Sequence, residues 1–550
     1  MPTITCYGAV REIGGNKILL QDGGSRIMLD FGKGFSAEGM FFDEFLQPRT
    51  NSALRDLLTL RILPPIPGIY RRDLLTHAGV WPELKKKGIP DSSRKLFEIG
   101  LESYDDYTAK HGPAIDGILL SHGHTDHCQH LCFVDPRIPV YCTSATLAIL
   151  KAAEEMGRGG YDSDICGVKT RSWSTYGSAG TFEGELKVAP DTDGPPRDFR
   201  VVEPYKPFAV GGYEVTAIPV DHSVPGACAF SIKCPSGKSV FYTGDLRFHG
   251  RFSLGTSNLT TGLREFARNL SPDMLITEGT RIESNTKDNE SDVEKKIAEI
   301  VSGSDGLAII DFGWKDTTRF QTIRNVAEAT GRRLAISPKV AYLMNLLHTE
   351  DPANYPDITC DKTVCTYLKR QGSMVYSPAD YSAFKHTLGL CTDWGPSSKD
   401  MKKAWPNDLD YIEPRMCHFN QGVRAYDVAA KPSSYILHAG YFDMNELFDL
   451  APPAGSIFVR AATEPFCDEM VMDEIRLGNW LNFFGINDGA GIQRSHVSGH
   501  ASGEDLLDFI VDMKPGRIVP IHTDKPELFA EALGAKFEVT QPEIAEKISF

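Results

Sequence analysis

Four side chains that can bind metal ions lie within six residues of one another, directly after a short apolar run. The apolar run is Ile118-Leu119-Leu120, and the four side chains are those of His122, His124, Asp126 and His127. Histidine and aspartate at this density are costly to bury unless a cation lies among them. In an extended chain alternate side chains share a face, so His122 and His124 can bind one ion while Asp126 and His127 address another. The spacing therefore predicts a site for two metal ions, in preference to a solvated surface loop.

This segment resembles the His-x-His-x-Asp-His signature of the metallo-β-lactamase superfamily. Three more strand-like runs, each ending in a possible ligand or its partner, follow the order of that family's motifs, and they end at Asp30, His222 and Asp245. The resemblance implies that His222 completes a three-histidine site with His122 and His124, and that Asp245 bridges both ions. It also implies that Asp30 lies outside the ligands and orients a ligand histidine.

The C-terminal part contains segments similar to motifs B and C of the β-CASP nucleases. His500 lies in a His-Val-Ser-Gly-His-Ala-Ser run, and His522 follows the strand-like run Arg517-Ile518-Val519-Pro520-Ile521. Glu278, after another strand-like run, matches the acidic motif A. The resemblance implies that His522 joins Asp126 and His127 around the second ion. It further implies that Glu278 holds His500, which donates a proton to the leaving oxygen or stabilises its charge.

Two features narrow the resemblance within this family. A histidine at motif C accompanies RNA processing, so His522 favours RNA over DNA. The motif B run and the segment Val10-Arg11-Glu12-Ile13-Gly14-Gly15-Asn16 are similar to ribonuclease J-like proteins. Three departures remain: the interval from Asp30 to His122 is long, Thr523-Asp524 replaces the usual Gly-Glu, and few residues follow His522. Processivity and oligomeric state therefore do not follow from the resemblance.

The turn around His500 has two interpretations. It precedes a helical apolar pattern over residues 504–513, so its N–H groups and serine hydroxyls could bind a backbone phosphate or a 5′-phosphate. The residues concerned are Ser498, Gly499, His500, Ala501 and Ser502. Ser502 is equally expected to be the N-cap of that helix.

Composition bounds these interpretations. The 550 residues, 41% of them hydrophobic, are enough for several domains, and no apolar run is long enough to span a membrane. No signal peptide is evident, so a cytoplasmic location is expected. The net charge of −15 argues against a protein that coats nucleic acid by its overall field, although metal ions and a local basic groove can dominate near a phosphate.

The expected fold is α/β: a metallo-β-lactamase αββα sandwich with an inserted α/β β-CASP cap domain. The sandwich is expected to comprise residues 1–286, with a helical insertion at about 34–110, and residues 484–550, while the cap comprises 287–483. The insertion carries several cationic side chains: Arg71, Arg72 and Lys85-Lys86-Lys87. The simpler interpretation is that they solvate the insertion, and the alternatives are an edge of the substrate channel or a dimer contact. In the cap, Lys315 and Arg319 are possible phosphate contacts or, more simply, surface cations.

Together these features predict a ribonuclease that hydrolyses single-stranded RNA with a water activated by two divalent metal ions, as a 5′-3′ exonuclease, an endonuclease or both. Asp126, Glu278 and His500 are its expected catalytic side chains. Zinc is the favoured metal and manganese the alternative. A DNA nuclease, a small-molecule metallo-hydrolase and a binding subunit without activity are the other function classes. A homo-oligomer is possible on the sequence.

Overall fold

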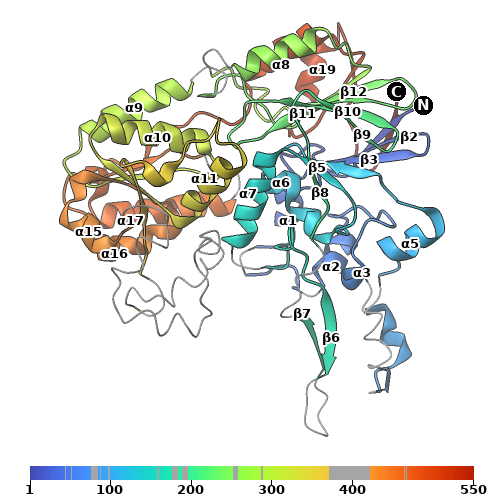
Figure 1. The fold of residues 1–550 in the computed structure, drawn as a ribbon, viewed down its shortest axis with the longest axis horizontal. Helices are drawn as coiled ribbons and strands as arrows, with labels where there is room; N and C mark the ends of the chain where they lie inside the picture. The colour runs from blue at the N-terminus through green and yellow to red at the C-terminus, as the bar shows by residue number, and fades with distance from the viewer. Residues whose placement is uncertain are drawn as a thin grey trace.

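The part of the chain that the structure describes forms three seven-stranded sheets and a separate β-hairpin, and Figure 1 shows their arrangement. The computed structural model describes the chain except residues 44, 51, 76–84, 87, 97–98, 158–159, 176–183, 189–195, 252–257, 287–288, 371–373, 375–421, 464 and 466–467. Lys87 lies outside the described residues. None of the described helices is both long enough and apolar enough to cross a bilayer.

The first two sheets pack face to face. The first has the order β23 (Lys547–Ser549), β1 (Thr3–Cys6), β2 (Ile18–Asp22), β3 (Ser25–Leu29), β4 (Gly117–Leu119), β5 (Val140–Cys142), β8 (Phe199–Val201). The second has the order β22 (Glu538–Val539), β21 (Arg517–Pro520), β13 (Met274–Thr277), β12 (Ser239–Tyr242), β11 (Cys228–Lys233), β10 (Tyr213–Pro219), β9 (Pro207–Val210). Alternate side chains of both sheets, such as Leu20 and Phe230, share one buried cluster, which burial of apolar surface stabilises.

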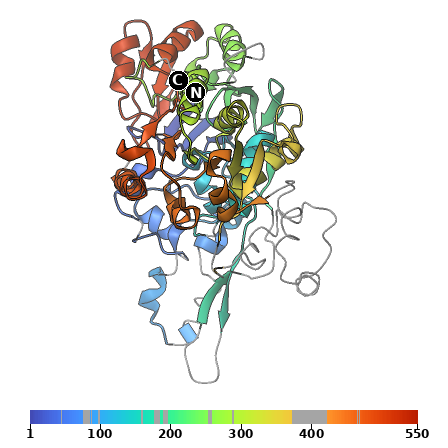
Figure 2. The ribbon, with the colours of Figure 1, turned by 90° about the vertical axis from the view of Figure 1, so that its left-hand side faces the viewer.

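Helices cover the outer faces of these two sheets. On the first sheet lie α2 (Ala53–Thr59), α3 (Arg72–Leu75) and part of α7 (Ser144–Glu155), and on the second lie α8 (Leu259–Arg268), α18 (Gly503–Met513) and α19 (Glu527–Leu533). The layers are therefore helix, sheet, sheet, helix, and the predicted αββα sandwich is confirmed. Because β1 pairs with β23, the two termini lie side by side (Figure 2).

The third sheet is entirely parallel. Its order is β17 (Gly422–Val423), β16 (Val364–Tyr367), β15 (Arg333–Ile336), β18 (Tyr435–His438), β14 (Ala308–Asp311), β19 (Ile457–Arg460), β20 (Gln493–Arg494). One face packs on α9 (Glu290–Ser302), α10 (Thr317–Ala329) and α11 (Pro338–Glu350), the other on α15 (Ala425–Ala430), α16 (Leu447–Leu450) and α17 (Asp468–Phe483). Ile309 and Ile310 point to opposite faces and both are buried, which explains the continuous apolar run of β14.

The insertion at residues 34–110 is more closely integrated than an arm. Its helices are α1 (Phe35–Gly39), α2, α3 and α5 (Tyr104–His111), and Leu54, Leu57 and Tyr70 belong to the core on the first sheet. Arg71 is not a solvating charge, because its buried guanidinium pairs with Asp73 and Asp164. The hairpin of β6 (Arg171–Thr175) and β7 (Gly184–Val188) projects from the body, and so does the part of the insertion around the short helix Asp91–Leu96 (Figures 1 and 2).

Strand ends bring the candidate site residues together. Asp30 follows β3 and His122 follows β4, two parallel neighbours in the first sheet. In the second sheet, the parallel strands β12, β13 and β21 are followed by Asp245, Glu278 and His522. Since carboxyl ends of parallel strands meet at one edge, loops from both sheets converge at the same end of the sandwich.

Candidate metal centre

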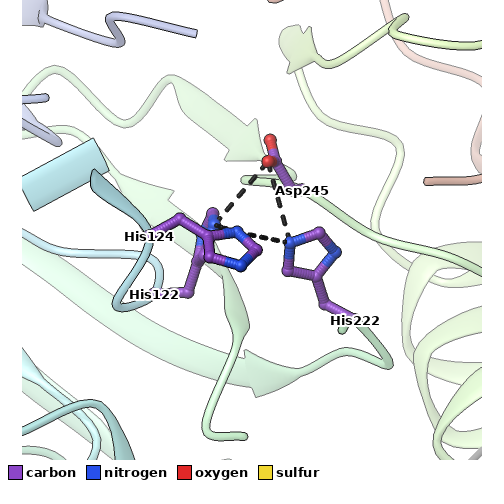
Figure 3. Close-up of side chains that lie close together, drawn as sticks. All are labelled: His122, His124, His222 and Asp245. Carbon is purple, nitrogen blue, oxygen red and sulfur yellow. Dashed lines mark hydrogen bonds and ion pairs between the residues drawn. The ribbon is translucent and has the colours of Figure 1, made fainter. Parts of the chain in front are cut away.

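One group of four ligand atoms is built from three histidines and an aspartate (Figure 3). Nδ1 of His124 lies 3.1 Å from Nε2 of His122 and 3.1 Å from Nε2 of His222. Oδ2 of Asp245 lies 3.6 Å from the His122 nitrogen and 3.9 Å from the His222 nitrogen. A tetrahedral zinc ion with Zn–N bonds of about 2.0–2.1 Å sets its nitrogens about 3.3 Å apart, so the three rings have the spacing of a metal site.

A second group shares Asp245 with the first. It consists of Asp126, His127, Asp245 and His522. Nε2 of His127 lies 3.1 Å from Oδ2 of Asp245, and Nε2 of His522 lies 3.1 Å from Oδ2 of Asp126. Asp126 and His127 lie in α6 (Thr125–Cys128), for which His124 is the N-cap, so one tight strand-to-helix turn supplies ligands to both groups. The carboxylate of Asp245 is thus placed between the two groups.

The unpaired atoms of this cluster fit a cation. Oδ1 of Asp245 is buried and has no hydrogen-bond partner among the described residues, and the 3.1 Å approach of the buried Nε2 of His127 to Oδ2 of Asp245 lacks hydrogen-bond geometry. A single proton on His124 Nδ1 cannot bond to both nearby histidine nitrogens, whereas one cation can accept all three lone pairs. Burial lowers the pKa of His122 and His222 well below its usual range and that of His124 to about 3, which favours the neutral imidazole that metals bind. The donor set, nitrogen and carboxylate oxygen, suits zinc or manganese.

Asp30 orients the second group. Its carboxylate accepts hydrogen bonds from the Ser121 N–H and hydroxyl, both at 2.7 Å, and from the Tyr242 hydroxyl at 2.5 Å. It also lies 2.7 Å from Nδ1 of His127. With Nδ1 held by Asp30, the Nε2 of His127 is the nitrogen left for a metal.

Two other ligand rings are fixed in the same manner. Nδ1 of His222 donates to the backbone oxygen of Gly499 at 2.6 Å, and Nδ1 of His522 lies 2.9 Å from the hydroxyl of Thr280. In each case the nitrogen facing the cluster is Nε2. These partners come from distant parts of the chain, so the ring orientations depend on the complete fold.

Backbone strain is concentrated at two of these positions. Asp30 has φ of 55° and His522 has φ of 50°, in the left-handed region that residues with a Cβ adopt infrequently. Such conformations cost free energy and persist where the surroundings determine them. At His522 the N–H donates to Ala9 at 2.8 Å, which fixes the left-handed turn after β21.

His500 lies beside both groups without belonging to either. Its ring centroid is 5.2 Å from that of His222 and 5.6 Å from that of His522. Nδ1 of His500 lies 2.9 Å from Oε2 of Glu278, whose other oxygen accepts the Leu246 N–H at 2.8 Å. Burial lowers the pKa of His500, but the charge and hydrogen bond of Glu278 outweigh it and raise the pKa to about 9. Asp245, Glu278 and His500 also form a third group with ligand spacing.

The turn around His500 is bonded differently from the expected phosphate pocket. The Ala501 N–H donates to Leu246 at 2.7 Å, and the His500 N–H donates to the Ser498 hydroxyl at 3.1 Å. Ser502 is fully buried and caps α18, accepting the Asp505 N–H at 3.3 Å. The interpretation of Ala501 and Ser502 as free phosphate donors is therefore wrong, because helix capping and packing engage these groups. Ser498 and Gly499 keep backbone N–H groups with no bond among the described residues.

Arg319 is not a phosphate contact. Its side chain is fully buried, and its Nε donates to Glu290 at 2.8 Å. Its guanidinium also donates to the backbone of Ala461 and approaches the Ser495 oxygen at 3.5 Å. It therefore joins α10 to the start of α9 and to the segment that leads to His500. Lys315, in contrast, reaches the centre: its Nζ donates to the Gly123 oxygen at 2.8 Å.

Three orienting side chains were not assigned roles from the sequence: Ser121, Tyr242 and Thr280. Ser121 and Tyr242 lie inside the motif-like runs, next to or near a ligand, which is the only signal that could have pointed to them. Their partners depend on how the two sheets pack, because Tyr242 reaches Asp30 across the sandwich.

The comparisons with known proteins cover the same residues. A model of the beta-lactamase superfamily domain matches residues 104–284, and one of the Zn-dependent metallo-hydrolase RNA specificity domain matches residues 489–540. The first range contains all ligand candidates except His522, which lies in the second together with His500. Both regions of the chain that supply candidate ligands are therefore similar to metallo-hydrolase domains.

Curated relatives agree over part of their length. Ribonuclease J of Mycobacterium tuberculosis (strain H37Rv) is 26% identical over 227 residues, which are 40% of this chain and 34% of that protein. Ribonuclease J of Sinorhizobium meliloti is 21% identical over 224 residues, again 40% and 34%. The matched region thus spans about a third of each relative. A crystal structure of a protein of unknown function from Enterococcus faecalis V583 covers all of both chains with a TM-score of 0.63 and 18% identity, which shows a shared fold.

The sandwich, the cluster of candidate ligands at its strand ends and the match of residues 104–284 to the beta-lactamase superfamily domain together define a metallo-β-lactamase fold. In the RNA specificity domain and in the region matched by the curated relatives, the chain is similar to ribonuclease J over part of its length.

Proposed function

We propose that this protein is a metal-dependent ribonuclease that hydrolyses phosphodiester bonds of single-stranded RNA with two metal ions. The observation that carries the proposal is Asp245, whose carboxylate is shared by two ligand groups beside the His500 and Glu278 pair. Two adjacent cations and a positioned proton donor are what phosphodiester hydrolysis needs. A small-molecule metallo-hydrolase would need the ligands but has no need of that pair.

His122, His124 and His222 would hold one ion, Asp126, His127 and His522 the other, and Asp245 both. The ions, when bound, would lower the pKa of a water molecule and neutralise charge on the phosphate, and zinc is the metal we propose. The protein's own part is positional. Asp30, Thr280 and Gly499 fix the rings of His127, His522 and His222, so the ligand nitrogens need little rearrangement.

His500 would act on the leaving group. Glu278 holds its Nδ1 and favours the protonated ring, so His500 can donate a proton to the leaving oxygen or stabilise its charge. Asp126 would support the reaction as a ligand of the second ion. Glu278 would support it by holding His500, the proton donor.

RNA is the proposed substrate because the segment carrying His500 and His522 matches an RNA specificity domain. We propose that the third sheet and its helices form a cap over the strand, with the boundary of residues 287–483 extended to include β20, which pairs with β19. Cleavage from the 5′ end, internal cleavage or both would be compatible with this arrangement.

One assay tests the proposal. Zinc-loaded and manganese-loaded protein is incubated with matched single-stranded RNA and DNA, labelled at the end or internally. Release of RNA fragments that requires metal supports the proposal, and the label distinguishes terminal from internal cleavage. Equal cleavage of DNA would shift the substrate to nucleic acid in general, and hydrolysis of small esters without RNA cleavage would overturn the proposal.

A further inference from the structure

Two lysines converge on one tryptophan at the edge of the third sheet that faces the metal centre. Trp314 and Lys315 follow β14, and Lys339 lies in the first turn of α11, after β15. Nζ of Lys339 lies 4.0 Å from the Trp314 ring centroid, and Nζ of Lys315 lies 5.5 Å from it. Both loops leave the carboxyl ends of parallel strands, the edge at which α/β sheets bind ligands.

This cluster adjoins the ligand loop. Nζ of Lys315 donates at 2.8 Å to the carbonyl of Gly123, which lies between His122 and His124. α11 lies beside α7 of the sandwich (Figure 1), and Tyr342 of α11 bonds to Glu155 of α7. The two ammonium groups are therefore held at the junction where the third sheet meets the metal-binding loop.

The charges of this lysine pair are only partly compensated, because the Asp126 carboxylate acts on Lys315 from beyond ion-pair distance. Among the described residues, no carboxylate lies within ion-pair distance of Lys315 or Lys339. Three other partly or fully buried cations of the same unit pair with carboxylates: Arg319 with Glu290, Arg324 with Asp361, and Arg460 with Glu474. Buried Arg332 bonds instead to backbone oxygens, those of Gly306 and Val301 among them. Both lysines are partly buried, and burial together with the neighbouring Lys315 lowers the pKa of Lys339 to about 8. Two adjacent, partly desolvated cations without an anion at ion-pair distance are unfavourable unless a ligand supplies the negative charge.

We propose that Lys315 and Lys339 bind a backbone phosphate of the nucleic-acid strand next to the metal centre, with Trp314 holding both side chains in place. This inference rests on the proposed function and adds a site that positions the strand. A lysine ammonium binds phosphate as a point charge, and two of them match one phosphate group or two neighbouring ones. The net charge of the chain is −15, so its overall field repels the negatively charged RNA backbone. The two lysines make the potential locally positive beside the metal centre.

The test measures binding by the full-length, metal-loaded protein carrying His500→Ala, so that the strand is not consumed. Fluorescence anisotropy with a labelled single-stranded RNA gives the Kd at several salt concentrations for Lys315→Met, Lys339→Met and the double variant. Methionine preserves most of the side-chain volume. Lys431→Met, which removes an exposed lysine after α15, is the matched control. Lys315→Arg and Lys339→Arg keep the charge, and melting curves verify folding.

We expect each Lys→Met change to weaken binding about tenfold or less and to reduce the slope of log K against log salt by about 0.7, the value for one phosphate contact with a single strand. The double variant should lose about twice that slope, the arginine variants should retain most binding, and Lys431→Met should bind as the parent does. Folded variants with the parent's Kd and slope would overturn the phosphate site, while RNA cleavage by the wild type would leave the proposed function standing. If RNA binds through these lysines but the wild type never cuts it, the phosphate site stands and the proposed function is overturned.

Discussion

The carboxylate of Asp30 and Nδ1 of His127 lie 2.7 Å apart, and neither side chain is exposed to solvent. Asp30 comes from the end of β3, while His127 lies in the turn after β4, so the contact joins two neighbouring strand ends. Ser121 and Tyr242 supply the remaining hydrogen bonds of the carboxylate. The tautomer and the plane of a ligand ring are therefore fixed by a residue that does not itself face the metal centre.

Asp30→Asn is expected to weaken binding of the second metal ion by about tenfold to a hundredfold, the range for loss of a partner that orients a ligand. The amide cannot offer the same set of acceptors to His127, Ser121 and Tyr242. Metal content after dialysis against graded chelator, measured by elemental analysis, gives the affinity. Asp22→Asn is the control, because Asp22 is also buried but accepts from Ser236 elsewhere in the sandwich. Unchanged affinity in Asp30→Asn would contradict the orienting role.

His522→Ala should lower the metal content from about two ions per chain to about one, because none of the four candidate ligands of the first group is His522. RNA cleavage should fall with the lost ion, while the thermal unfolding transition stays cooperative. His348→Ala, which changes a histidine bonded to the Tyr355 carbonyl, is the control and should retain both ions. If His522→Ala keeps two ions and cleaves RNA at the normal rate, His522 is not a ligand.

His500→Ala should slow RNA cleavage by about a hundredfold to ten-thousandfold, the usual contribution of general acid or base catalysis, with both ions retained. Glu278→Gln should slow it in the same direction, since the amide cannot hold the protonated ring as the carboxylate does. Elemental analysis beside single-turnover rates separates chemistry from metal loading. Loss of an ion in His500→Ala would instead assign His500 to the third ligand group, with Asp245 and Glu278.

That the candidate ligands lie together could be anticipated from the sequence, because strands end close to them. The run Val240-Phe241-Tyr242 predicts a buried strand, and Asp245 follows it by three residues, at the edge where strand ends meet. Its role between two ions was inferred from the resemblance to the family's motif. The parallel third sheet was predictable for the same reason, as apolar runs alternate with helical patterns. Both inferences use information within a few residues.

The orienting contacts and the role of Arg319 could not be anticipated in this way. Arg319 is a cation in a polar helical segment, and nothing in its neighbours indicates that Glu290 will lie 2.8 Å away in a fully buried pair. Ser502 illustrates the same limit: its sequence context suits both a cap and a phosphate site, and only packing of α18 decides for the cap. Pairings between distant segments are set by tertiary structure, not by local spacing.

The buried pair of Glu290 and Arg319 should make stability depend on acid pH. Burial raises the pKa of Glu290, but the hydrogen bond and charge of Arg319 outweigh this and lower it to about 2. A carboxyl with a depressed pKa stabilises the fold fully above its unfolded value of about 4.3, and that contribution is lost as pH falls toward 2. Arg319→Met should therefore cost about 3–5 kcal/mol at pH 7, because it leaves a buried carboxylate unpaired, and less as pH falls through this window. Unfolding free energies at pH 7 and at pH 3–4 measure the difference.

Arg370→Met is the control: its pair with Asp449 is exposed, so the change should cost less than about 1 kcal/mol at either pH. Equal costs for the two variants at pH 7 would mean that the buried pair does not stabilise the junction of α9 and α10.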